Sequence, residues 1–84
     1  MTDVEIYQRL TGIFREVFDD ESIVLGPQTA AHDIAAWDSL NHVILVVAIE
    51  QAFGIKFHSA EIEGLQDVGG MVSLIERELA AKHV

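Results

Sequence analysis

The feature that most constrains the fold is the spacing of apolar residues near the amino terminus. Thr2 is followed three residues later by Glu5, a capping-box pattern that begins many helices. Apolar side chains then recur at intervals of three and four residues, at Val4, Tyr7, Leu10, Ile13, Phe14, Val17 and Phe18. Because this spacing places them on one face of a helix, we expect a helix from about residue 3 to 18.

The segment from Ser39 to Phe53 gives two conflicting signals. Residues 43–49 are largely β-branched, which by propensity alone favours a buried strand. The segment is longer than most strands, however, and Gly54 stands where a left-handed residue ends many helices. Since Asp38 or Ser39 also supplies an N-cap, we predict a central helix.

A helix that is apolar on so many sides must be central or must keep an apolar face for a partner. We expect its core side chains to be Val43, Leu45, Val46 and Ile49. Ile44 and Val47 fit either the core or a partner surface.

Residues 20–38 hold Gly26-Pro27 and no sustained periodicity, which predicts a long ordered loop between these two helices. We expect four apolar residues to pin the loop to the core: Ile23, Val24, Leu25 and Ile34. Trp37 closes the loop and is expected to anchor its end against the bundle.

The carboxyl-terminal part of the chain predicts two further helices. Ser59 can cap a brief helix through Glu63 that Gly64 ends, and Asp67 can cap a last helix. The apolar stripe of that last helix is Val68, Met71, Val72, Ile75 and Leu79. Because 84 residues supply only one core, we expect residues 1–84 to form a single all-α domain. The predicted fold is a four-helix bundle of three longer helices and one short helix.

The charge of the chain limits its partners. Fourteen acidic and five basic residues give a formal charge of −9, which disfavours nucleic acids and anionic membranes because both select basic patches. Basic proteins are the expected partners. The absence of cysteine excludes disulfides and thiolate zinc sites, and the apolar run at residues 43–49 is too short to span a bilayer. We expect a cytoplasmic monomer.

The motif Trp37-Asp38-Ser39-Leu40 lies where the long loop meets the central helix. A hydroxyl at a helix start lies beside unpaired backbone N–H groups and the positive end of the helix dipole. Ser39 can therefore carry a phosphorylated group at low electrostatic cost. From Asp38 and Ser39 alone, a simple helix cap is the better explanation.

The residues around this motif resemble those of acyl carrier proteins. Asp38-Ser39-Leu40, followed by an apolar helix that ends in residues 48–55, is similar to the Asp-Ser-Leu motif and second helix of that family. Residues 59–62 and 65–72 resemble the third helix and the start of the fourth. The tripeptide alone is a weak signal, but the resemblance covers essentially the whole chain.

The resemblance implies a carrier and not an enzyme. In that family a phosphopantetheinyl transferase moves 4′-phosphopantetheine from coenzyme A onto the motif's serine, here Ser39, and the thiol of this arm then holds an acyl group. Asp38 matches the acidic residue that helps to recruit the transferase and its magnesium-bound coenzyme A, and Leu40 matches a residue that partners contact. The remaining partner surface, for acyl-activating ligases, acyltransferases or synthases, is expected at Val47, Glu50, Glu61 and Glu63.

Two departures from the family concern the choice of partner. Carriers of bulk fatty-acid synthesis usually have acidic residues along the second helix and a glycine shortly before Asp-Ser-Leu. This chain has instead Asn41, Ile44, Gln51 and Ala52 on the helix, and Trp37 before the motif. Because charge steers encounter and excludes wrong partners, these departures favour a dedicated pathway of polyketide, specialised-lipid or aminoacyl transfer.

Two alternatives to an acyl carrier stay open: an aminoacyl or peptidyl carrier, and a cofactor-free helical adaptor that binds other proteins. Peptidyl or aminoacyl carriers tend to have Gly-Gly-His or Gly-Gly-Asp before the serine, where this chain has Ala36-Trp37-Asp38, so acyl cargo is preferred. A cofactor-free helical adaptor would share the core and the acidic surface. Whether Ser39 accepts the arm separates an adaptor from a carrier.

Catalytic and metal sites have little support. A hydrolase built on Ser39 and His42 lacks a Gly-x-Ser-x-Gly turn and a strand before the serine, so we interpret His42 as a helix-surface residue near the arm. No metal site is expected, because no histidine pair has the spacing of metal ligands among His32, His58 and His83.

Overall fold

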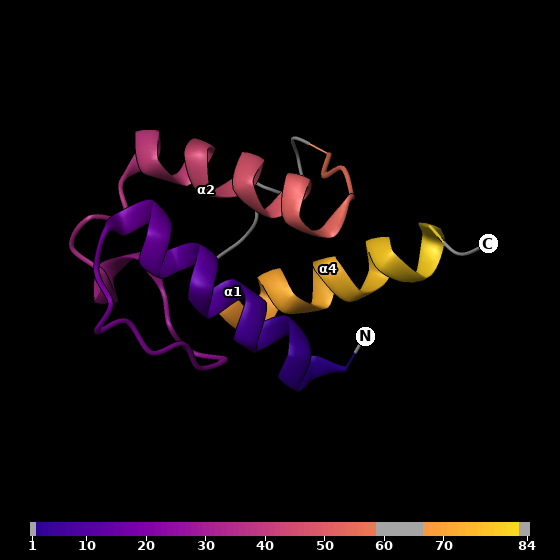
Figure 1. Ribbon diagram of the computed structural model, residues 1–84, viewed down its shortest axis with the longest axis horizontal. Coiled ribbons are helices and arrows are strands. Elements are labelled where there is room, and N and C mark those ends of the chain that lie inside the picture. The colour runs from indigo at the N-terminus through magenta and orange to yellow at the C-terminus, as the bar shows by residue number, and fades with distance from the viewer. Residues whose placement is uncertain (1, 59–66, 83–84) are drawn as a thin grey trace.

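The computed structural model describes residues 2–58 and 67–82, and in these ranges it contains helices and no strand. The helices are α1 (Asp3–Phe18), α2 (Ser39–Phe53) and α4 (Val68–Lys82), with a short 3-10 turn at Ala31–Asp33. Figure 1 shows α1 running antiparallel to both α2 and α4, and it packs against each of them. The all-α prediction is confirmed, while the short helix predicted from Ser59 to Glu63 lies outside the described residues.

The first helix begins and ends as its sequence predicts. The Thr2 hydroxyl accepts a hydrogen bond from the Glu5 backbone N–H at 3.3 Å, and the Glu5 carboxylate accepts one from the Thr2 N–H at 3.3 Å. At the other end Asp19 adopts a left-handed conformation with φ of 51°, and its N–H bonds the carbonyls of Arg15 and Glu16. Both ends therefore satisfy backbone groups that a helix leaves unpaired.

The buried row of α1 begins at Ile6, which the sequence pattern did not include. Ile6, Leu10, Phe14 and Phe18 are buried at intervals of four residues. Val4, which was predicted to lie on the stripe, is exposed because it falls outside this row. The core is completed by side chains of the other helices: Leu45, Ile49, Phe53, Val68, Met71, Val72 and Ile75.

Backbone hydrogen bonds tie the long loop to the amino-terminal end of α4. The Val68 N–H donates to the carbonyl of Thr29 at 2.8 Å, and the Gly69 N–H donates to that of Pro27 at 2.9 Å. A Cβ atom at Gly69 would lie 2.8 Å from the Pro27 oxygen, so glycine permits this approach. Asp67 caps α4 as predicted, because its carboxylate accepts a bond from the Gly70 N–H at 2.8 Å.

Three of the four residues predicted to pin the loop do so. Ile23 is buried, and Leu25 and Ile34 pack against the core. Val24 was predicted to join them but is 79% exposed, because successive side chains of an extended segment point to opposite sides. The Arg15 side chain also holds the loop, since its Nε donates to the Ile23 carbonyl at 2.9 Å. No helix in the described part of the chain is long and apolar enough to cross a membrane.

Candidate functional site

Ser39 lies at the first position of α2, with its side chain exposed. The N-cap is Asp38, whose Oδ1 accepts a hydrogen bond from the Asn41 N–H at 2.8 Å. The Asp38 carbonyl accepts the first intrahelical bond, from the His42 N–H, at 2.8 Å. The carboxylate therefore fixes the start of the helix, and the Ser39 hydroxyl projects from a position whose own amide has no intrahelical acceptor.

A serine in this position fits a phosphodiester. Its side chain is accessible to a modifying enzyme, and the positive end of the α2 dipole lies beside it. The negative charge of a phosphodiester on Ser39 would lie near the carboxylate of Asp38. Because Asp38 is exposed, water and salt screen the repulsion between the two charges. The start of α2 can thus hold a phosphorylated arm at its surface without rearranging the core.

Trp37 anchors the loop end just before this site. Its ring packs edge-on against Phe14 with centroids 5.2 Å apart, and it lies 6.2 Å from the ring of Phe18. The indole Nε1 donates a hydrogen bond to His42 Nδ1 at 3.0 Å, and the two rings are stacked with an interplanar angle of 20°. The predicted anchor role of Trp37 is confirmed.

His42 therefore differs from the surface residue that the sequence suggested. It is half-buried, and its Nδ1 accepts a hydrogen bond from the indole N–H of Trp37. Trp37 and His42 occupy the two positions, one before the N-cap and one at the fourth helical residue, that pack together in a hydrophobic staple. The pair fixes the direction in which the chain enters α2.

Asn41 adds a second connection across the same junction. Its side-chain nitrogen donates to the Ala36 carbonyl at 2.7 Å, while its backbone N–H bonds Asp38. Two hydrogen bonds therefore join residues before Ser39 to residues after it. One links the side chains of Trp37 and His42, and the other links the Asn41 side chain to the Ala36 carbonyl. These contacts hold the exposed hydroxyl at a defined point of the surface.

The outer face of α2 is apolar from its first turn onward. Four side chains spaced as one helical row are exposed, with fractions of 70% for Leu40, 60% for Val43, 48% for Ile44 and 45% for Val47. We call these four residues the α2 stripe. The prediction that Val43 belongs to the core is wrong, whereas Leu45, Val46 and Ile49 are buried as expected. Val43 is exposed because the opposite face of the helix already fills the space against α1.

Of the acidic residues predicted to contact partners on this side of the molecule, the structure describes Glu50. Glu50, in the last turns of α2, is half-buried, and its carboxylate accepts a hydrogen bond from the Phe57 N–H at 2.9 Å. It thus holds the segment that follows the helix, next to the left-handed Gly54 that ends it with φ of 66°. Glu61 and Glu63 lie outside the described residues.

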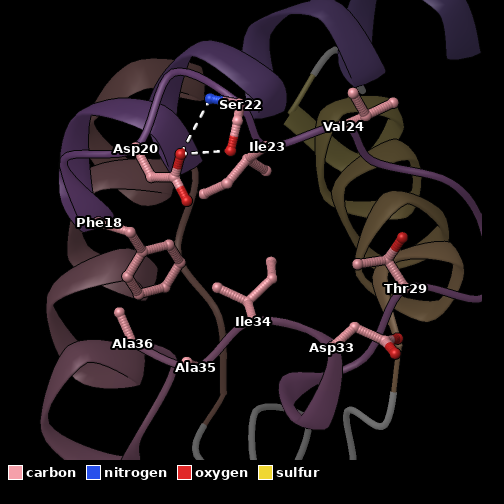
Figure 2. Close-up of a pocket in the computed structure, with 10 residues that line it drawn as sticks. All are labelled: Phe18, Asp20, Ser22, Ile23, Val24, Thr29, Asp33, Ile34, Ala35 and Ala36. Atoms are coloured by element: carbon pink, nitrogen blue, oxygen red, sulfur yellow. Dashed lines mark hydrogen bonds between the residues drawn. The ribbon is translucent and has the colours of Figure 1, made fainter.

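A cleft of about 400 Å³ opens between the end of α1 and the long loop (Figure 2). Phe18, Ile23 and Ile34 line it, together with Ala35 and Ala36 just before Trp37. At its rim the Ser22 hydroxyl and N–H donate to the Asp20 carboxylate, and these bonds hold the pKa of Asp20 below its ordinary value. The cleft belongs to the loop side of the molecule and does not include Ser39. In the described ranges no cluster of three or more histidine, aspartate or glutamate side chains is arranged to hold a metal ion.

The sequence profile of one family matches residues 8–75, which is most of the chain, and its description is "Phosphopantetheine attachment site". Curated relatives named acyl carrier protein include those of Thermotoga maritima and Prochlorococcus marinus. That of Thermotoga maritima is 38% identical over 76 residues, covering 89% of this chain and 93% of the relative. That of Prochlorococcus marinus is 38% identical over 77 residues, covering 90% and 95% respectively.

Two further similarities extend this result. The meromycolate extension acyl carrier protein of Mycolicibacterium smegmatis is 32% identical over 76 residues, covering 90% of this chain and 77% of the relative. The solution structure of a holo acyl carrier protein from Geobacter metallireducens is similar with a TM-score of 0.87 and 48% identity. This similarity covers 92% of the present chain and 88% of the other.

Proposed function

Since the chain belongs to the acyl carrier protein family, whose prosthetic group is 4′-phosphopantetheine, we propose that Ser39 is the residue to which this group is joined. Members of the family are carriers rather than enzymes. The single observation that carries the proposal is an exposed serine at the first position of α2, held in place on both sides. Asp38 and Leu40, its neighbours in the Asp-Ser-Leu motif, are exposed beside it.

The attachment step follows from ordinary phosphate chemistry. The Ser39 oxygen forms a bond to the pantetheine-bearing phosphorus of coenzyme A, and the serine proton passes to solvent or a base of the transferase. The pyrophosphate bond breaks, and adenosine 3′,5′-bisphosphate leaves. Once joined, the arm supplies a terminal thiol that carries an acyl group as a thioester, while the protein supplies position and recognition.

The cargo is proposed to be an acyl group of a dedicated pathway, of the specialised-lipid or polyketide type, delivered to partner enzymes in the cytoplasm. The support is the composition of α2, where Asn41, Ile44 and Gln51 stand at positions at which carriers of bulk fatty-acid synthesis usually have acidic residues. Partner choice depends on such surface charge, so a change in it should change the set of enzymes served. Housekeeping elongation enzymes are expected to process this carrier much more slowly than their own.

Intact mass tests the attachment site. Purified chain is incubated with coenzyme A, magnesium and a broad-range phosphopantetheinyl transferase, and the wild type is expected to gain one phosphopantetheine. Ser39→Ala should gain none, whereas Ser73→Ala, which alters an exposed serine of α4, should be modified like wild type. Failure of the wild type to gain mass would favour a cofactor-free adaptor, and modification of Ser39→Ala would move the site elsewhere.

A further inference from the structure

The cleft between the end of α1 and the long loop has an apolar floor and an acidic rim. Figure 2 shows the side chains of Phe18, Ile23 and Ile34 pointing toward one another across a space of about 400 Å³. Phe18 and Ile23 are buried, whereas Asp20 and Asp33 at the rim are exposed. Among the described residues, no lysine or arginine lines the cleft. An anionic ligand would find no counter-charge there, so the cleft fits a ligand with an apolar, uncharged body.

Asp20 offers a hydrogen-bond acceptor to such a ligand. Both bonds from Ser22, one from its hydroxyl and one from its N–H, go to Oδ1 of Asp20. Figure 2 shows the other oxygen directed toward Phe18 and the cleft. The Ser22 bonds and the charge of Arg15 lower the pKa of Asp20, so its carboxylate is charged at neutral pH. Because a charged acceptor forms a stronger hydrogen bond than a neutral one, this oxygen suits a hydroxyl group on the ligand.

The cleft lies within reach of an arm joined to Ser39. Ala36 lines the cleft and precedes Ser39 by three residues, which span at most about 11 Å of extended chain. An arm made of phosphate, two amide-linked units and cysteamine is longer than this span. A group carried at the end of the arm can therefore enter the cleft while it stays covalently attached.

Attachment makes even a shallow cleft sufficient. The cleft opens to solvent, since Val24, Ala35 and Ala36 on its walls are exposed, and it would bind a free molecule weakly. A group on a short flexible linker, however, has an effective concentration in the millimolar range. The thioester also removes the carboxylate charge of a free acid, which the acidic rim would repel. Both properties favour tethered cargo over a free fatty acid.

We propose that this cleft holds the tethered cargo, a short acyl group whose hydroxyl donates to Asp20 and whose chain packs on Ile23 and Ile34. The inference rests on the proposed attachment of the arm to Ser39, and it deepens that function by naming the class of cargo. The volume fits such a group, because a cavity of about 150 Å³ already holds benzene, a molecule of six carbons. The cleft thus has room for an acyl chain of about six carbons together with its hydroxyl.

Nuclear magnetic resonance of the loaded protein tests the proposal. A broad-range transferase loads isotope-labelled chain from 3-hydroxyhexanoyl coenzyme A or from hexanoyl coenzyme A, and intact mass confirms that loading is complete. We expect nuclear Overhauser effects between the hydroxyacyl chain and the methyl groups of Ile23 and Ile34. Relative to the arm without cargo, the amide shift change at Ala35 should be about threefold larger for 3-hydroxyhexanoyl than for hexanoyl, since an additional hydrogen bond favours the bound state.

Two carboxylates of the rim provide a matched pair of variants. Asp20→Ala removes the acceptor that faces the cleft and should make the two cargoes equal. Asp33→Ala removes a carboxylate whose Oδ2 already accepts a bond from the Ala30 N–H at 2.9 Å, and it should keep the preference for the hydroxyl. Circular dichroism checks that both variants fold. If Asp20→Ala does not fold, Ala35→Leu fills part of the cleft from an exposed position and should remove the contacts with Ile34.

Other results would overturn the inference. Equal shift changes for the two cargoes in the wild type would show that Asp20 does not recognise the hydroxyl. Contacts of the chain with core methyl groups of α2 and α4, with none to Ile34, would place the cargo inside the bundle. If the wild type gained no mass during loading, the attachment proposal and this inference would both fail. Complete loading without any contact at the cleft would remove this inference alone.

Discussion

Helices α1 and α2 have nearly the same length, 16 and 15 residues, but they divide their surfaces differently. α1 buries one row and exposes charged side chains on the opposite face, whereas α2 is apolar on both faces. The inner face of α2 packs on α1, and its outer face is the α2 stripe. The comparison teaches that most apolar side chains of α1 serve the fold, with Val4 as an exposed exception, whereas α2 carries a whole apolar face that the core does not use.

The largest expected effect compares the loss of stability when leucine is replaced by alanine on the buried face and on the exposed face of α2. Leu45→Ala removes a fully buried side chain and should lower the free energy of unfolding by about 3 kcal/mol. Leu40→Ala removes the same atoms from the exposed face and should lower it by less than about 0.5 kcal/mol. Urea unfolding followed by circular dichroism measures both. Equal losses would mean that the stripe stabilises the fold and is no free surface.

The bounds of these helices were predictable because caps are local. Thr2 with Glu5, Asp38, Gly54 and Asp67 each act within one helical turn, so their residue types predict where a helix begins or ends. Burial was less predictable for Val43. When a helix is apolar on every side, periodicity does not indicate which face meets the core, and only packing against α1 decides it.

The candidate site was also predicted in part. The motif at Ser39 was identified by its residues, but the contact between Trp37 and His42 was missed, because Trp37 precedes the helix and helical periodicity does not apply to it. The hydrophobic-staple positions carry the signal that would have revealed the pair. Val24 was misplaced for the same kind of reason, since the direction of a loop side chain depends on local backbone conformation.

A smaller effect is expected from the interactions that fix the amino-terminal ends of α1 and α2. α1 begins with reciprocal hydrogen bonds between Thr2 and Glu5, and α2 begins with the Trp37–His42 staple. In a double-mutant cycle, Trp37→Phe keeps a ring against Phe14 but removes the indole N–H, and His42→Ala removes its acceptor. We expect a coupling energy of about 1 kcal/mol from urea unfolding, because one part-buried hydrogen bond is lost in either variant.

The emission of Trp37, the only tryptophan of the chain, reports the same contact. His42→Ala should shift its emission spectrum in the folded state, since the stacked imidazole is removed. Additive stabilities together with an unchanged spectrum would show that the pair does not hold the start of α2.

The smallest effect concerns a pair of exposed carboxylates that join the start of α1 to α4, a charged contact that the α2 stripe lacks. A hydrogen bond between the side chains of Glu76 and Asp3 raises the pKa of Glu76 above its ordinary value of 4.5, because only the protonated acid can donate to a carboxylate. The folded state therefore binds this proton more tightly than the unfolded state. The stability that this binding adds is present below pH 4.5 and is lost as the pH rises through the raised pKa.

Glu76→Gln should break this dependence, because an uncharged amide can donate to Asp3 at any pH. Its melting temperature should exceed that of the wild type at pH 7, and the difference should shrink toward pH 4, where Glu76 becomes protonated. Asp3→Asn provides the matched background, in which Glu76→Gln should show no such pH dependence. If the difference in melting temperature between Glu76→Gln and the wild type stayed constant from pH 7 to pH 4, it would not arise from titration of Glu76. The contact between Asp3 of α1 and Glu76 of α4 would then contribute nothing to the pH dependence of stability.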